Sequence, residues 1–244
     1  MARDSYMTFT EHLEELRWCL LKSLAAVVLA FLLCFYFSDR IVAFMIAPLT
    51  KTLQPGQGLI GTGVAEAFFF EMKVALVAGT FVASPVIFYQ LWRFLAPGLR
   101  EIEKRLVIPF VLFSSLFFLG GALFCYWGVL PIAFLYFIDQ YRSLEVSPEI
   151  RIGEYFTFFS RMILAFGVTF ELPVFTFFLV RVGLWDYRTM WRTFRYAIIA
   201  IFILAAILTP GPDIASQILL AVPLTLLYLV SIGVAYVWRK TEPF

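Results

Sequence analysis

Glu171 is the only acidic residue within a long apolar, phenylalanine-rich segment that extends over residues 156–180. In a helix, Glu171 would lie roughly 15 Å along the axis from Arg181, close to the midplane of a hydrocarbon layer about 30 Å thick. A carboxylate at this depth costs at least about 2.5 kcal/mol on insertion scales, so it should face a polar partner, a cavity or another subunit. Gly167, one turn earlier on the same face, predicts a hollow beside it.

Glu171 could have a functional or a purely structural role. A structural role would be a helix-to-helix hydrogen bond, or a buried carboxyl group that stays protonated. The cost of burial favours a functional role. Candidate intramembrane partners are Thr169, Ser216 and Gln217.

A second acidic group, Glu11, Glu14 and Glu15, precedes the first apolar segment and is followed by Arg17. Its simplest interpretation is a solvated helix start, stabilised by the helix dipole. The alternative is a docking surface for a cationic partner. Glu103 has Lys104 and Arg105 beside it, so it also has a structural explanation.

The composition identifies the class of protein that must position these acids. The chain has 244 residues, of which 62% are hydrophobic and 19% aromatic, and its mean hydropathy is +0.89. These values predict an all-α polytopic membrane protein with a single domain over residues 1–244. We find no catalytic signature, metal-ligand spacing or cofactor motif, and we expect neither an enzyme nor a nucleic-acid-binding protein. Cys19, Cys34 and Cys125 lie in apolar segments and should be buried thiols.

Six membrane spans are expected, after an amphipathic cytoplasmic helix over residues 1–17. Their approximate boundaries are 18–37, 66–95, 106–137, 156–181, 196–209 and 214–237. The last two should be short, because residues 196–209 are too few to cross a full bilayer. Residues 41–49 are also too few and are expected to lie on the membrane surface. Intramembrane prolines should curve the bundle into a concave shape.

The distribution of basic residues predicts the orientation. Most of the 19 lysine and arginine residues fall on the side of the bilayer that carries both chain ends. By the positive-inside rule, both termini are cytoplasmic.

Several segments resemble the TatC family, the core receptor subunit of the twin-arginine protein translocase. The resemblance runs from about residue 8 to 237, with the same six-span layout. It is carried by residues 11–17, 47–49, 84–99, 103–105, 166–173 and 208–213.

The resemblance implies a receptor for twin-arginine signal peptides in the cytoplasmic (inner) membrane. Such a receptor works with single-span TatA- and TatB-type proteins, as a homo-oligomer within the complex. It exports folded proteins with the proton-motive force, and no cofactor is implied. Matching positions suggest roles for eight residues: Glu15, Glu103, Arg17 and Pro97 at the signal-peptide site, Glu171 and Gln217 as an intramembrane polar pair, and Pro48 and Asp213 on the outer side.

The chemistry of the residues agrees with these roles, because a guanidinium pairs bidentately with a carboxylate and lysine cannot reproduce that geometry. Glu15 and Glu103 could therefore hold adjacent arginines. A rival interpretation is a proton-coupled small-molecule transporter with Glu171 as its coupling carboxylate. The sequence shows no internal repeat and no pair of broken helices in corresponding positions, which disfavours this rival.

Overall fold

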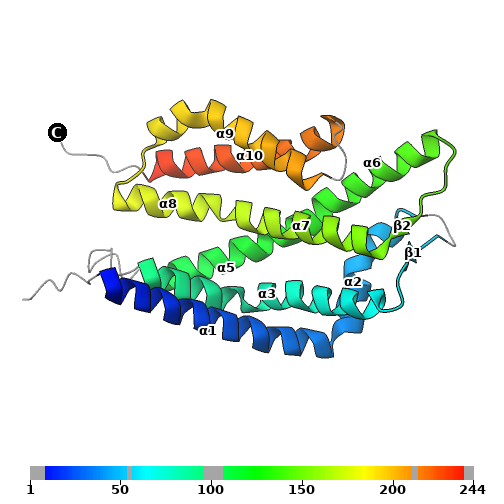
Figure 1. Ribbon diagram of the computed structural model, residues 1–244. Coiled ribbons are helices and arrows are strands. Elements are labelled where there is room, and N and C mark those ends of the chain that lie inside the picture. Colours follow the sequence, from blue (N-terminus) through cyan, green and yellow to red (C-terminus); the bar gives the residue numbers. More distant parts are fainter. Residues whose placement is uncertain (1–8, 54–56, 96–106, 210–213, 239–244) are drawn as a thin grey trace, which may run out of the picture.

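The computed structural model describes residues 9–53, 57–95, 107–209 and 214–238. Six of its helical segments are long and apolar enough to cross a membrane, as the sequence predicts. Figure 1 shows them side by side in a bundle. One end of the bundle carries the first turn of α1 and the last turns of α3, α8 and α10. We call it the amino-terminal end. The other end carries α2 and two short strands, and we call it the strand end.

Helices α1 (Phe9–Tyr36) and α3 (Glu66–Leu95) lie against each other along their length. A Cβ at Gly79 would lie 2.8 Å from the backbone nitrogen of Phe31. Only glycine allows this backbone-to-backbone approach, as in other membrane helix pairs. At the amino-terminal end, the His12 ring stacks on Phe94 with centroids 4.3 Å apart.

Helix α2 (Ser38–Thr50) is the segment expected on the membrane surface, but it packs into the bundle. Pro48 has no N–H and therefore leaves the carbonyl of Phe44 without its usual helical donor. The hydroxyl of Tyr126 donates to that carbonyl at 2.7 Å. Tyr155 donates to the Met45 carbonyl at 2.6 Å, and Leu49 is fully buried in the main core. The apolar face of α2 therefore covers protein.

The third span extends further than expected. Helix α5 (Val107–Phe124) passes through a π-helical turn, η2 (Cys125–Val129), into α6 (Leu130–Ser143). The turn precedes Pro131, whose ring would clash with the carbonyl four residues earlier in a regular α-helix. The helix continues six residues beyond the predicted end, through polar turns in which Arg142 and Asp139 form an ion pair of 3.0 Å.

The fourth span is two helices, α7 (Ile152–Phe170) and α8 (Leu172–Val182), which meet at Glu171. Pro173 causes the break, since it offers no N–H to the carbonyl of Thr169. The predicted hollow beside Gly167 is wrong. A Cβ at Gly167 would lie 2.8 Å from the Phe118 ring, and one at Gly121 would lie 2.7 Å from the Phe166 carbonyl. The two glycines let α5 and α7 touch.

The last spans are α9 (Tyr187–Leu208) and α10 (Ile214–Val237), and they are the two shortest of the six. Helix α9 has 22 residues because it begins at Tyr187, well before the predicted boundary at residue 196. The added turns carry Arg188, Arg192 and Arg195, so the apolar segment is shorter than the helix. The hydroxyl of Tyr228 donates to the Met190 carbonyl at 3.1 Å and joins α10 to α9.

Two strands that the sequence did not predict join the connectors at the strand end. Strand β1 (Leu59–Ile60) pairs in parallel with β2 (Ile150–Arg151), with Leu59 opposite Ile150. Each strand has only two residues, which is too short for a periodic sequence signal. Cys19, Cys34 and Cys125 are free and buried, as expected.

Candidate functional site

The first polar site lies at the start of α1. Glu15 and His12 are three residues apart and share one helix face. His12 stacks on Phe94, so this face lies against the end of α3. Glu15 is half-buried, and its Oε2 is buried without a hydrogen-bond partner among the described residues. Glu14 on the next face is exposed. Glu15 is thus the acid of this group that the fold holds at a helix interface.

The other predicted members of this site divide into two kinds. Pro97 and Glu103 fall in residues 96–106, outside the described part of the chain. Arg17 is exposed and forms no ion pair with another described residue. The described part of the chain therefore places Glu15 and Arg17 on α1, and Glu103 lies outside it.

The second polar site is the break between α7 and α8. Glu171 Oε1 is buried and accepts no hydrogen bond from the described residues. The carboxyl group lies against the hydroxyl of Ser114 and the backbone of Phe118, both on α5. Ser114 accepts a hydrogen bond of 3.2 Å from the indole nitrogen of Trp92 on α3. A polar chain therefore links three helices within an apolar bundle.

Trp92, the first member of this series of polar contacts, is packed tightly among aromatic rings. Its side chain is 3% exposed and stacks on Phe110, with ring centroids 4.6 Å apart. The ring of Phe178 packs edge-on against it at 4.7 Å. Trp92 is thus a core residue.

The predicted companions of Glu171 have other partners. The amide nitrogen of Gln217 donates to the Phe202 carbonyl on α9 at 2.8 Å. The Thr169 hydroxyl donates to the Ala165 carbonyl in its own helix. No hydrogen bond joins Glu171 to Gln217 among the described residues, so the intramembrane pair stays a prediction.

Comparison with known proteins decides the family. The family profile described as "Sec-independent protein translocase protein (TatC)" matches residues 11–223. The chain belongs to the TatC family. The TatC of Campylobacter jejuni is 44% identical over 233 residues, covering 95% of this chain and 94% of the relative. That of Koribacter versatilis is 42% identical, covering 94% and 85%.

A solved structure agrees with this assignment. A crystal structure of the twin-arginine translocase receptor TatC superposes with a TM-score of 0.84 at 36% identity, covering 93% of this chain and 99% of the other. The resemblance and the six-helix fold predicted from sequence are thereby confirmed. This TatC-family chain is a multi-pass membrane protein and a transport component of a multi-subunit translocase.

Pro48 and Asp213 are the two remaining positions implied by the TatC resemblance. Pro48 is buried within α2, where it frees the carbonyl that Tyr126 caps. Asp213 falls in residues 210–213, outside the described residues. Sequence reasoning missed Ser114 and Trp92. The only available signal was the pair of adjacent serines, Ser114 and Ser115, in an otherwise apolar span.

Proposed function

We propose that this TatC protein is the receptor and core subunit that binds twin-arginine signal peptides at the cytoplasmic face of the inner membrane. Both of its termini are cytoplasmic, so the amino-terminal end of the bundle faces the cytoplasm. With TatA- and TatB-type single-span partners, as an oligomer, it exports folded proteins with the proton-motive force. Family membership and the excess of basic residues at that end support this proposal.

The observation that carries the proposal is the buried Oε2 of Glu15. A buried acceptor without a donor costs about 1–3 kcal/mol, and more when it is charged. A guanidinium supplies charge and paired donors in the geometry that a carboxylate accepts. Glu15 is held at the α1–α3 interface, so a bound arginine would lie beside the cytoplasmic end of both helices. Glu103, a few residues after α3, is our proposed second carboxylate.

The test is equilibrium binding of a fluorescent twin-arginine signal peptide to the purified full-length protein. We expect Glu15→Gln and Glu103→Gln each to weaken binding about tenfold or more, since each removes a charge-assisted pair. Glu14→Gln is the matched control, because Glu14 is exposed in the same turn. A twin-lysine peptide should bind weakly to the wild type. Equal affinity for the two peptides would reject recognition by these carboxylates.

We further propose that Glu171 receives a polar group from a TatA- or TatB-type helix. Its unsatisfied Oε1 supports this role, because a buried intramembrane acceptor is costly and a donor from another subunit would satisfy it. Photocrosslinking from a neighbouring position, Val168, should detect the partner in the wild type and lose it in Glu171→Ala. Peptide docking should survive in that variant. If docking failed while the crosslink persisted, the assignment would be reversed.

A further inference from the structure

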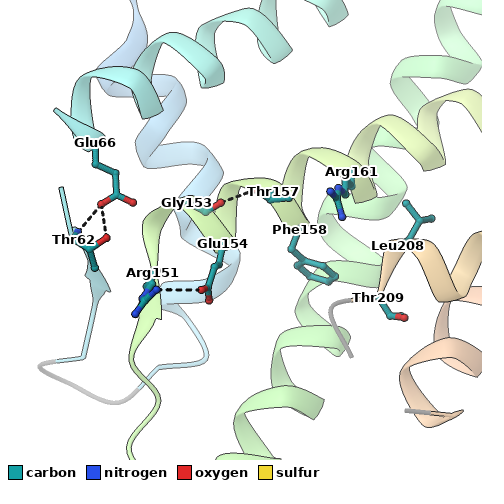
Figure 2. A pocket seen from close by; sticks show the side chains of 10 residues that line it. All are labelled: Thr62, Glu66, Arg151, Gly153, Glu154, Thr157, Phe158, Arg161, Leu208 and Thr209. Atoms are coloured by element: carbon teal, nitrogen blue, oxygen red, sulfur yellow. Dashed lines mark hydrogen bonds and ion pairs between the residues drawn. The ribbon is translucent and has the colours of Figure 1, made fainter. Parts of the chain in front are cut away.

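A polar pocket of about 540 Å³ lies at the strand end, apart from the Glu15 and Glu171 sites. Its walls come from the start of α3, the first turns of α7 and the end of α9 (Figure 2). Polar and apolar walls meet there: Phe158 and Leu208 line it beside Arg151, Glu154 and Arg161.

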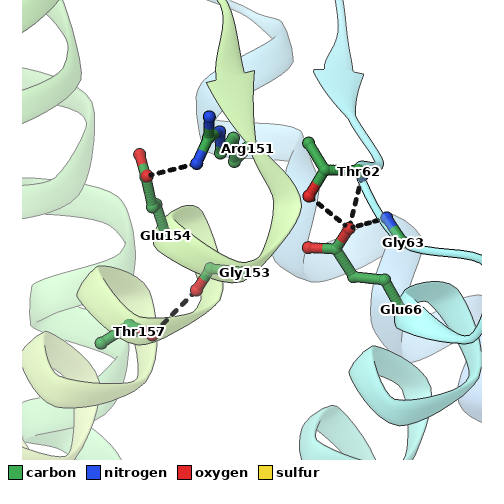
Figure 3. Close-up of polar contacts among 7 residues, drawn as sticks. All are labelled: Thr62, Gly63, Glu66, Arg151, Gly153, Glu154 and Thr157. Atoms are coloured by element: carbon green, nitrogen blue, oxygen red, sulfur yellow. Dashed lines mark hydrogen bonds and ion pairs between the residues drawn. The ribbon is translucent and has the colours of Figure 1, made fainter.

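One of the pocket's carboxylates is already satisfied. Glu66 Oε2 accepts hydrogen bonds from the backbone nitrogens of Thr62 and Gly63, and from the Thr62 hydroxyl at 3.1 Å (Figure 3). Gly153 approaches the other oxygen so closely that a Cβ there would lie 3.3 Å from Oε1. Glu66 therefore fastens the β1 connector to α3 and α7, and it is not free to bind a ligand.

The remaining charges are weakly engaged. Arg151 and Glu154 are 4.0 Å apart and both side chains are well exposed, so their attraction is largely screened. Arg161 is exposed and forms no ion pair with a described residue. The pocket thus offers the Arg161 guanidinium, which has no ion-pair partner among the described residues, and the weakly paired charges of Arg151 and Glu154 to an outside group.

The depth of Arg161 indicates what that group is. Arg161 lies nine residues after the start of α7, which is roughly 13.5 Å along the axis. In a membrane-spanning segment of 31 residues, this places its Cα inside the hydrocarbon layer. Helical side chains tilt toward the helix N-terminus, so the guanidinium reaches back toward the headgroups at the strand end. A lipid phosphate at that level is the nearest abundant anion.

Three pocket residues on α7 place a second requirement on the ligand. Glu154, Phe158 and Arg161 follow one another at i, i+4 and i+7 and share one face of the helix (Figure 2). Glu154 and Arg161 are separated by roughly 10.5 Å along the axis. A headgroup with a phosphate and a primary ammonium can bridge this separation, with one charge at each end.

We propose that this pocket binds one phospholipid whose headgroup carries both a phosphate and a primary ammonium, of the phosphatidylethanolamine type. The phosphate accepts hydrogen bonds from Arg161, and the ammonium donates to Glu154. The acyl chains run along Phe158 and Leu208 into the bilayer. A purely anionic headgroup fits less well, because it would place negative charge against Glu154. The proposal does not depend on signal-peptide binding.

The test is native mass spectrometry of the full-length, delipidated protein in detergent, titrated with phosphatidylethanolamine, phosphatidylcholine or phosphatidylglycerol of identical acyl chains. We expect the wild type to bind phosphatidylethanolamine most tightly. Arg161→Gln should weaken that binding about tenfold, the value of one charge-assisted hydrogen-bonded contact, and Arg161→Lys should restore part of it. Arg40→Gln is the control, because Arg40 is an exposed arginine on α2 outside the pocket.

Glu154→Gln tests the contact with the ammonium separately from the contact with the phosphate. It should abolish the preference for phosphatidylethanolamine over phosphatidylcholine, whose quaternary ammonium donates no hydrogen bond, while phosphate-dependent binding remains. Identical lipid binding by the Arg161→Gln and Arg40→Gln variants would overturn the proposal. So would displacement of the lipid by millimolar inorganic phosphate, which indicates a free-ion site, or a pocket that is filled only when a single-span partner is added.

Discussion

The indole nitrogen of Trp92 donates a hydrogen bond of 3.2 Å to the hydroxyl of Ser114, whose side chain also lies against Glu171. Ser114 is 1% exposed, so water cannot replace either contact. One small hydroxyl therefore joins α3 and α5 to the break between α7 and α8. The position of the Glu171 carboxyl group depends on the packing of a tryptophan that lies on another helix.

Ser114→Ala should lower the stability of the protein by about 1–3 kcal/mol, because it leaves the buried Trp92 N–H without an acceptor. The measurement is the thermal unfolding midpoint of the purified protein in detergent. Ser115→Ala is the control. The Ser115 hydroxyl donates only to the Val111 carbonyl in its own helix, so its loss should shift the midpoint little. Equal shifts for the two variants would show that the contact between helices contributes nothing.

Tyr126→Phe should destabilise the protein by about 1 kcal/mol or more, because the Phe44 carbonyl then loses its donor. Pro48→Ala restores a backbone N–H that can bond the same carbonyl. The cost of Tyr126→Phe should therefore be smaller in the Pro48→Ala background. A double-mutant cycle of unfolding midpoints measures this coupling. Strict additivity would mean that Tyr126 does not compensate for the proline.

Gly121→Ala should be strongly destabilising, because its Cβ would lie 2.7 Å from the Phe166 carbonyl, which belongs to the backbone and cannot rotate away. Gly120→Ala is a matched control in the adjacent position, where a Cβ would meet no atom within 4 Å. That change should be neutral or stabilising, since alanine favours helix over glycine by up to about 1 kcal/mol. The changes in thermal unfolding midpoint that the two variants cause, relative to the wild type, should differ in sign or clearly in size.

Glu66→Ala should loosen the connector that carries β1, because it removes the acceptor of the Thr62 and Gly63 backbone N–H groups. Hydrogen exchange at these two amides should become faster, by about tenfold for each charge-assisted bond that is lost. Glu154→Ala is the control, since the Glu154 carboxylate is not bonded to these amides. Unchanged exchange at Thr62 in Glu66→Ala would contradict the structural role of the carboxylate.

The sequence predicted the six spans because apolar segments of bilayer length can hardly be interpreted otherwise. It misplaced helix ends where helices continue through polar turns. Arg142 and Asp139 extend α6, and the arginines after Tyr187 extend α9, although each of these residues lowers the local hydropathy. Chain-local hydrogen bonds stabilise those turns whether or not lipid surrounds them.

The candidate sites were predicted in part. Glu171 was identified because burial of an acid within a membrane is costly, whereas Glu15 was assigned to its site through the resemblance to the TatC family. The contact of Glu171 with Ser114 depends on how α5 and α7 meet, which no pattern within one helix encodes. Gly167 shows the ambiguity directly. A small residue permits either a hollow or a close contact, and here it permits contact with Phe118.

The short parallel pairing of β1 with β2 has a mechanical consequence. It joins the connector before α3 to the connector before α7. The hydroxyls of Tyr126 and Tyr155 donate hydrogen bonds to two neighbouring carbonyls of α2 and hold that helix in place. At the far end of the bundle, α1 and α3 meet through ring stacking such as that of His12 on Phe94. The two ends of the bundle are therefore held together by different contacts: main-chain pairing and tyrosine hydroxyls at the strand end, and packed aromatic rings where the start of α1 meets the end of α3.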